Sequence, residues 1–466
     1  MKSEITLNRL QGLIKAYDVR GIVPEQFDEN IAYQIGQAFV IVLKLRKSEG
    51  GCGQVVIAHD MRPSGPALVK SFAQGVIDQG VDVLHMGLAS TDGLYFATGF
   101  LNIAGAMFTA SHNPAEYNGI KLAKPGAAPV GQDSGLKEIT NLIVQGIDQY
   151  QGSKGKESTQ DLNTEYVKHL HSLVNLKLAR KLKVVIDAGN GMGGFSVPKV
   201  FAESNFEIIP MFFELDGTFP NHEANPIEPA NLVDLQKRVI LEKADIGIAF
   251  DGDADRAFFI DERGESISPS AITALIAKRE LKREPGATVI HNLITSKSVA
   301  EVVAENNGKS IKTRVGHSFI KQVMKDTNAV FGGEHSGHFY FRDFWFADSG
   351  MLAALHVLAA LGETKVGTTF SSLIKEFDRY IASGEINTRV ENVVDTSNKV
   401  RAHFAANGDV QIDDLDGLTF ASSNWWVNVR PSNTEPLLRL NAEAKDRATM
   451  EKLRDEVLAI IRKDAK

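Results

Sequence analysis

Residues 246–256 read Ile-Gly-Ile-Ala-Phe-Asp-Gly-Asp-Ala-Asp-Arg, an apolar run that ends in three carboxylates at alternate positions. A short uninterrupted apolar run is typical of a strand buried on both faces. Asp251, Asp253 and Asp255 follow it directly, and Gly252 lets the backbone turn them around a common point. Clustered carboxylates repel one another unless a cation, a proton or a basic neighbour intervenes. Their oxygens favour Mg²⁺, Mn²⁺ or Ca²⁺, so the loop predicts a metal site; the alternative is a solvated acidic turn.

Apolar runs and helical patterns alternate along most of the chain. Early in the sequence the runs and the helix-like stretch between them are Val55–Ala58, Pro66–Gln79, Val81–Leu84 and Ala106–Thr109. Similar strand patterns start at Lys183–Asp187 and at Thr288–His291. This rhythm predicts parallel sheets covered by helices, in three α/β units of about 100–150 residues each.

The chain has two predicted domain boundaries and a C-terminal region with a different sequence pattern. The polar stretch Gln151–Gln160 predicts a linker, and a second boundary is expected after Arg256. From about Phe370 the pattern changes to extended runs through Trp425 and Trp426, followed by a charged helix near Thr449–Lys463. We expect a smaller α+β domain there.

Composition limits the possible partners. The chain has 466 residues, 43% of them hydrophobic, a net charge of −7 and Cys52 as its single cysteine. The length predicts three or four domains, and the acidic balance disfavours nucleic acid as a partner. No intrachain disulfide can form, and no apolar stretch reaches about 18 residues. We therefore expect a cytoplasmic protein that does not bind a membrane, with no signal peptide.

A glycine pattern allows a different interpretation. Gly189, Gly191 and Gly194 form G-x-G-x-x-G after an apolar strand, and Glu214 follows twenty residues later. This matches the dinucleotide fingerprint of an NAD-dependent dehydrogenase. Pro198, however, limits the helix that should receive the pyrophosphate, and such turns also occur for packing alone.

A serine loop lies at the end of another predicted strand. Residues 109–114 read Thr-Ala-Ser-His-Asn-Pro, and Lys121 follows after a short turn. Ser111 caps the next turn, or it is a nucleophile that carries a phosphoryl group. No G-x-S-x-G elbow surrounds it, which disfavours an acyl-transfer hydrolase. A phosphorylated serine would offer further oxygens to Mg²⁺.

Two polar loops have the chemistry for a phosphosugar. Residues 332–338 read Gly-Gly-Glu-His-Ser-Gly-His and offer a carboxylate, a hydroxyl and imidazoles for sugar hydroxyls. Residues 430–436 read Arg-Pro-Ser-Asn-Thr-Glu-Pro and offer a guanidinium, hydroxyls and an amide for a phosphate dianion. The alternative is a pair of ordinary turns.

Together with residues 17–21, Tyr-Asp-Val-Arg-Gly, these four motifs resemble the α-D-phosphohexomutase family, especially its phosphomannomutase and phosphomannomutase/phosphoglucomutase branch. They occur in the family's order over nearly the full length. The resemblance implies three mixed α/β domains of related topology and a C-terminal α+β domain like the TATA-binding protein, around a central cleft. The expected domains are 1–152 with the serine loop, 153–257 with the metal loop, 258–372 with the sugar loop and 373–466 with the phosphate loop.

The resemblance also implies roles for single residues. Ser111 would be the phosphoserine, and it would bind one Mg²⁺ per chain with the three aspartates. Lys121 and His338 would transfer protons, with nearby cations lowering the pKa of Lys121, while Arg20 and Arg256 would offset charge on the phosphoryl group. The expected substrate contacts are Tyr17, His317, Glu334, Ser336, Arg430, Ser432, Asn433 and Thr434.

The implied activity is the interconversion of mannose 6-phosphate and mannose 1-phosphate, with glucose phosphates as further substrates. A hexose 1,6-bisphosphate would be both intermediate and activator, and the protein would be a monomer or homodimer. The alternatives are a phosphoglucosamine mutase, the NAD-dependent dehydrogenase, and a phosphosugar-binding protein without activity.

Overall fold

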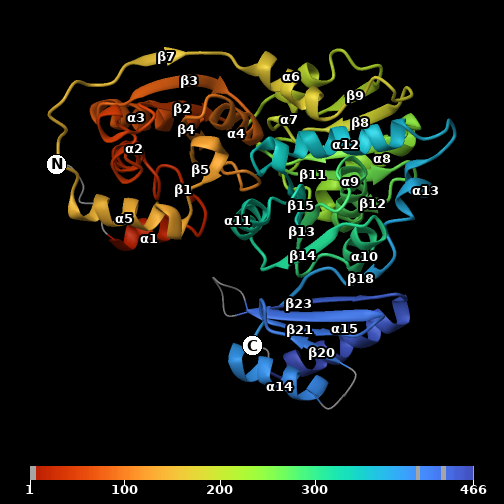
Figure 1. Cartoon of the computed structure of the whole chain (residues 1–466). Helices are drawn as coiled ribbons and strands as arrows, with labels where there is room; N and C mark the ends of the chain where they lie inside the picture. The colour runs from red at the N-terminus through yellow and green to blue at the C-terminus, as the bar shows by residue number, and fades with distance from the viewer. Residues whose placement is uncertain (1–6, 406–409, 432–436, 465–466) are drawn as a thin grey trace. The chain divides into compact units, whose positions relative to one another are not determined.

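The computed structural model describes residues 7–405, 410–431 and 437–464. They form two compact units (Figure 1). One unit runs to Ile267 and includes Ser336–Leu373; the other contains Ser268–His335 and the chain from Ile374 onwards.

The first sheet carries the serine loop. Its strands lie in the order β1, β5, β4, β2, β3, β7, with β6 paired to β5. Their bounds are β1 Val19–Ile22, β2 Gln54–His59, β3 Asp82–Leu88, β4 Ala104–Phe108, β5 Tyr117–Lys124, β6 Ala128–Pro129 and β7 Glu157–Thr159. The central strands β4, β2 and β3 are parallel, whereas β5 is antiparallel to both β4 and β1. Parallel strands end at the same edge, which brings the loops after β2 and β4 together.

Helices cover both faces of this sheet. Their bounds are α1 Leu7–Leu13, α2 Glu29–Val42, α3 Gly65–Asp78, α4 Thr91–Phe100 and α5 Leu136–Gln145. One hydrophobic core joins α2, α3 and α5 to alternate residues of β2, namely Val55 and Ile57. Side chains alternate across a strand, so Val56 faces away from this core, towards α4.

Glycines let α2 and α3 approach closely. A Cβ on Gly36 would lie 2.3 Å from the Phe72 carbonyl oxygen, and one on Gly75 would lie 2.1 Å from the Tyr33 carbonyl oxygen. Real side chains do not reach such distances, so the helix crossing depends on both glycines.

The second sheet, in the same unit, carries the metal loop. Its strand order is β12, β11, β10, β8, β9, and all five positions of β10 are buried. The bounds are α6 Asn163–Leu173, β8 Lys183–Asp187, α7 Gly193–Val200, β9 Glu207–Met211, α8 Val233–Glu242, β10 Ile246–Phe250, β11 Ala257–Asp261 and β12 Ser266–Ile267. Because β11 pairs antiparallel with β10, the sheet continues past the expected boundary at residue 257.

A β-hairpin and the helix that follows it complete this unit. This segment contains the antiparallel strands β16 Phe339–Phe341 and β17 Ala347–Asp348, then α12 Gly350–Gly362 and the start of α13 Phe370–Ile374. Helix α12 is buried along nearly its whole length, because its residues are almost all apolar.

The second unit contains a parallel and an antiparallel sheet. In the parallel sheet the strands lie in the order β14, β13, β15, and helices α9 to α11 surround them. The bounds are α9 Pro269–Arg283, β13 Thr288–Asn292, α10 Lys297–Glu305, β14 Lys309–Thr313, α11 His317–Thr327 and β15 Phe331–Gly333. The antiparallel sheet orders β18, β23, β22, β21 and β20, with β19 also paired to β23. Its elements are β18 Ile381–Ala382, β19 Ile386–Arg389, α14 Val393–Ala405, β20 Gln411–Asp413, β21 Leu418–Ala421, β22 Trp425–Pro431, β23 Leu437–Ala444 and α15 Arg447–Ile461. Helices α14 and α15 share one core with this sheet (Figure 1).

The predicted fold class is confirmed: α/β domains precede a C-terminal domain with an antiparallel sheet. Each strand predicted from an apolar run overlaps an observed strand. The linker prediction for Gln151–Gln160 was wrong in one respect, because Glu157–Thr159 forms β7 and pairs with β3. Within the described ranges, no helix has both the length and the apolar character needed to cross a membrane.

The helix crossing generates a stability prediction. Gly75→Ala should lower the free energy of unfolding by about 1–3 kcal/mol, because the added methyl group overlaps the Tyr33 carbonyl. The control is Gly12→Ala on α1, where a Cβ meets nothing within 4 Å. Chemical denaturation should show the control unchanged or more stable by up to about 1 kcal/mol. If Gly75→Ala proves as stable as Gly12→Ala, the close approach of α2 and α3 is contradicted.

Candidate functional site

Ser111 lies in a tight turn directly after β4. Its backbone has a φ of 49°, in the left-handed region that non-glycine residues rarely adopt. The residue is 4% exposed, and its Oγ donates a hydrogen bond of 2.7 Å to Asp251 Oδ2. The turn thus aims the hydroxyl at Asp251, the first carboxylate of the metal loop.

Arg62 fixes the backbone of the serine loop. Its guanidinium, 1% exposed, lies 3.3 Å from Asp60. It donates hydrogen bonds to four backbone carbonyls, those of Ser111 (3.0 Å), Asn113 (2.6 Å), Pro114 (2.7 Å) and Tyr117 (2.8 Å). Only a planar fork of donors can satisfy so many acceptors at once. The strained turn therefore rests on one buried side chain.

The serine loop and the metal loop touch through a glycine. A Cβ on Gly252 would lie 2.4 Å from the Ser111 carbonyl oxygen. The residue between the first two aspartates must therefore be glycine for the loops to meet.

The three aspartates are almost fully buried and lie close together. Ligand oxygens of Asp251, Asp253 and Asp255 all lie within 4.8 Å of one another. Burial raises the pKa of Asp251 to about 7; the charge of Arg256 opposes this rise, and the other two carboxylates add to it. Asp253 Oδ1 has no hydrogen-bond partner among the described residues.

Lys121, on β5, bridges two of the carboxylates. Its Nζ donates to Asp253 Oδ2 at 2.7 Å and to Asp255 Oδ2 at 2.5 Å. Burial lowers the pKa of Lys121, but the two carboxylates outweigh burial and raise it well above its ordinary value. The expectation that cations depress this pKa does not hold in this arrangement, in which Lys121 is a cation surrounded by acids.

Arg256 joins the serine to the acidic loop. Its Nε donates to Asp251 Oδ2 at 2.8 Å and its Nη2 donates to Ser111 Oγ at 3.2 Å. His112 Nδ1 lies 3.2 Å from the same serine oxygen. Burial, then the charges of Arg256 and Arg20, lowers the pKa of His112 to about 2, so its imidazole is neutral.

Arg20, on β1, also contacts the serine loop. It donates hydrogen bonds of 2.5 Å to Asn113 Oδ1 and to Asp18 Oδ2. Its charge is therefore partly neutralised and held beside the residues that follow Ser111. Tyr17 precedes this pair and is half-buried.

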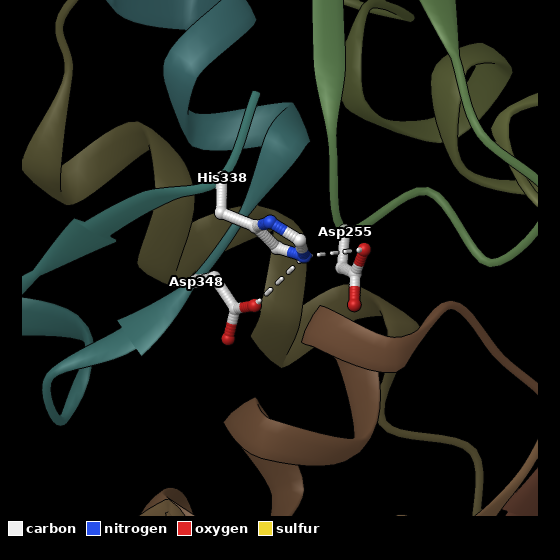
Figure 2. A group of neighbouring side chains, drawn as sticks. All are labelled: Asp255, His338 and Asp348. Atoms are coloured by element: carbon white, nitrogen blue, oxygen red, sulfur yellow. Dashed lines mark ion pairs between the residues drawn. The ribbon is translucent and has the colours of Figure 1, made fainter. Parts of the chain in front are cut away.

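His338 lies between two buried acids (Figure 2). Its Nε2 is 3.7 Å from Asp255 Oδ1 and 3.8 Å from Asp348 Oδ2, and its Nδ1 is 3.1 Å from Ser336 Oγ. The expected proton-transfer histidine and the metal loop thus meet in one unit. Asp348 was missed because it belongs to no recognised motif and reaches the site only through the β16–β17 hairpin.

The second unit holds the expected phosphate arginine. Arg430 Nη2 donates to Glu385 Oε2 at 2.8 Å, and Arg439 Nη1 donates to Glu385 Oε1 at 3.1 Å. Arg430 and Arg439 are direct partners on β22 and β23, which sequence alone did not reveal. Glu334, from the sugar loop, is 4% exposed. Ser432, Asn433, Thr434 and the side chain of His317 lie outside the described residues.

The glycine-rich turn after β8 packs against the metal loop. A Cβ on Gly191 would lie 2.6 Å from the Gly252 carbonyl oxygen, and one on Gly194 would lie 2.2 Å from the Phe213 carbonyl oxygen. These glycines thus have a packing role, without a dinucleotide.

A buried serine, three carboxylates and basic residues around them define the chemistry of a phosphoryl-transfer enzyme. Family models of phosphoglucomutase/phosphomannomutase α/β/α domains I, II and III match residues 11–150, 164–264 and 268–380, and the model of the C-terminal domain matches 385–460.

Individual relatives agree with the family models. A phosphomannomutase of Escherichia coli is 38% identical over 443 residues, 92% of this chain and 94% of the relative. A relative from Xanthomonas campestris described as phosphohexose mutases is 37% identical, over 96% of this chain and 98% of its own. The crystal structure of a family protein from Burkholderia thailandensis has a TM-score of 0.88 at 31% identity, covering 98% of this chain and 99% of that one.

The chain belongs to the phosphoglucomutase/phosphomannomutase family, the α-D-phosphohexomutases. It is a phosphohexomutase, an intramolecular phosphotransferase that acts on hexose phosphates. The dehydrogenase interpretation of the glycine pattern is thereby excluded.

The variant Arg62→Lys tests whether the Arg62 side chain holds the serine loop in place. The ammonium keeps the charge but cannot reach four carbonyls, so the free energy of unfolding should fall by at least about 2 kcal/mol. Mutase activity should fall as the Ser111 turn relaxes. The control is Arg263→Lys, whose side chain is 64% exposed and pairs with Asp261. The free energy of unfolding of this control should stay within about 0.5 kcal/mol of that of the original chain. Unchanged stability and activity of Arg62→Lys would contradict this role.

Proposed function

We propose that this phosphohexomutase is a phosphomannomutase, which interconverts mannose 6-phosphate and mannose 1-phosphate with Ser111 as the phosphoryl carrier. One observation carries the proposal: Ser111 Oγ lies 2.7 Å from Asp251, the first of the three buried carboxylates. A serine that only capped a turn would need no such acidic partners.

The donor set fits a magnesium ion. Ser111, through its phosphoryl oxygens, and Asp251, Asp253 and Asp255 would hold one Mg²⁺. All donors are oxygen atoms, and the buried, unpartnered Asp253 Oδ1 is suited to a cation. When bound, Mg²⁺ supplies positive charge that stabilises the transferring phosphoryl group.

The carrier serine works in two half-reactions. The Oγ–P bond of phosphoserine 111 breaks as the free hydroxyl of a hexose monophosphate forms a new P–O bond, giving a hexose 1,6-bisphosphate. The hydroxyl proton leaves to a base, for which His338 is the candidate. In the second half-reaction the other phosphoryl group returns to Ser111. A hexose 1,6-bisphosphate also activates the unmodified serine in this way.

The surrounding cations have separate tasks. Arg256 lies 3.2 Å from Ser111 Oγ and offsets the charge that develops on the serine oxygen. Lys121 offsets the charge of the aspartates, and Arg20 is the third cation of the site. Since its pKa is raised, Lys121 acts in this scheme as a charge clamp, and His338 is favoured over it for proton transfer.

On the substrate side, Glu334 and Ser336 would bind sugar hydroxyls, and Tyr17 and His317 would line the site. Arg430 with Ser432, Asn433 and Thr434 would bind the phosphate that is not transferred. Glu385 holds Arg430 by an ion pair of 2.8 Å, which orients the guanidinium for a bidentate contact.

The names of the relatives bear on which hexose phosphate the enzyme prefers. The Escherichia coli relative is named for mannose, whereas the Xanthomonas relative is named for hexoses in general. Mannose is therefore proposed as the main substrate and glucose as a second one. A phosphoglucosamine mutase is the less favoured candidate, because Asn433 stands where glycine is common in that branch.

Intact-mass spectrometry tests the carrier. Incubation with glucose 1,6-bisphosphate should add about 80 Da, the mass of one phosphoryl group, and the gain should map to Ser111. Ser111→Ala should show no gain, whereas Ser134→Ala, at an exposed serine, should gain as the original chain does. A stable gain on Ser111→Ala would overturn the carrier assignment.

Coupled assays test the sugar preference. Turnover measured with mannose, glucose and glucosamine 1-phosphates should be highest for mannose, lower for glucose and lowest for glucosamine. Ser111→Ala is the control and should lose activity towards every substrate by at least about 1,000-fold, since the nucleophile is gone. A preference for glucosamine phosphate would replace the proposed activity by the alternative.

A further inference from the structure

We propose that Asp255, His338 and Asp348 form a second divalent-metal site, of the kind that takes Zn²⁺ or Co²⁺, beside the proposed magnesium site and sharing Asp255 with it. Its occupation would arrest the enzyme, a consequence that rests on the proposed role of His338. The binding itself is independent of that role.

The distances among the three side chains suit a shared ion. Nε2 of His338 lies 3.7 Å from one carboxylate oxygen and 3.8 Å from the other, too far for hydrogen bonds (Figure 2). A tetrahedral zinc ion with bonds of about 2.0–2.2 Å holds its ligand atoms about 3.3–3.6 Å apart, slightly closer than these atoms lie here. The three donor atoms all lie within 4.8 Å of one another, so small side-chain rotations would bring them onto one ion.

A buried oxygen without a partner points into this group. Asp255 is 1% exposed, and its Oδ1 has no hydrogen-bond partner among the described residues. That oxygen is the one that faces His338 Nε2, while Arg256 Nε lies farther away at 3.9 Å. Burying such an atom is unfavourable unless a cation or donor satisfies it.

The surrounding structure holds the ligands in place. Asp348, 3% exposed, pairs with Tyr340 across the β16–β17 hairpin. The backbone of His338 bridges that of Arg256, one residue after Asp255. Ser336 Oγ lies 3.1 Å from Nδ1 and orients the ring so that Nε2 faces the carboxylates. A partner on the second ring nitrogen is the usual support of a metal-binding histidine.

The local charge also favours a further cation. Four buried carboxylates lie here, Asp251, Asp253, Asp255 and Asp348, and the cations that pair with the first three are Lys121 and Arg256. A phosphorylated Ser111 would add about two negative charges. Asp255 can serve both sites, since its Oδ2 faces Lys121 and its Oδ1 faces His338.

The donor types select the metal. The proposed magnesium site has only oxygen donors, whereas this group combines an imidazole with two carboxylates. Imidazole nitrogen favours Zn²⁺ and Co²⁺ over Mg²⁺. An ion on Nε2 would also occupy the nitrogen proposed to accept the hydroxyl proton, so turnover would stop while Mg²⁺ stayed bound.

A metal titration of the full-length protein tests the site. The protein, saturated with Mg²⁺, is titrated with Co²⁺ and followed by visible absorption, and Zn²⁺ is then added to displace the Co²⁺. We expect one Co²⁺ that excess Mg²⁺ does not displace, and at least tenfold weaker binding in Asp348→Asn. The control is Asp343→Asn, a less buried aspartate near the same hairpin that pairs with Arg342; it should bind Co²⁺ as the original chain does.

Competition by Mg²⁺ for this Co²⁺, or unchanged binding in Asp348→Asn, would overturn the proposal. If Asp348→Asn does not fold, anomalous diffraction at the zinc edge decides on the original chain: a peak among Asp255, His338 and Asp348 supports the site, and a peak only at Asp251–Asp255 overturns it. Mutase activity with Mg²⁺ alone tests the proposed function separately.

Discussion

The burial of three carboxylates in one short loop is the constraint on which the rest of the first unit depends. Like charges this close cannot be removed from water without compensation. Lys121 from β5 and Arg256 from the end of the loop provide it, and Arg256 also donates a hydrogen bond to Ser111. Two separate sheets must therefore meet at their loop edges, and Gly252 leaves the space in which the metal loop approaches the Ser111 carbonyl.

Much of this arrangement could be predicted from the sequence. The apolar runs located β2, β4, β8, β10 and β13, because a strand buried on both faces leaves a continuous hydrophobic signature. Ser111 and the aspartates could be predicted because each motif follows such a strand directly. Placing them in one site depended on the family resemblance, because Ser111 and the aspartates follow strands of two different sheets.

The remainder depends on contacts between residues distant in sequence. Arg62 binds carbonyls about fifty residues away, and Asp348 comes near His338 and Asp255 only after a hairpin has folded. Glu385 joins two arginines that become neighbours through strand register. The pKa of Lys121 was expected to fall because the cations were evident in the motifs, but the carboxylates that contact it decide the direction.

The left-handed backbone at position 111 restricts which amino acid can carry the phosphoryl group. Threonine has the same hydroxyl chemistry, but its branched β-carbon fits a φ of 49° poorly. Although serine and threonine carry the same hydroxyl group, the backbone conformation at position 111 therefore favours serine. Any evolutionary route from serine to threonine at this position would first have to rebuild the loop that Arg62 holds.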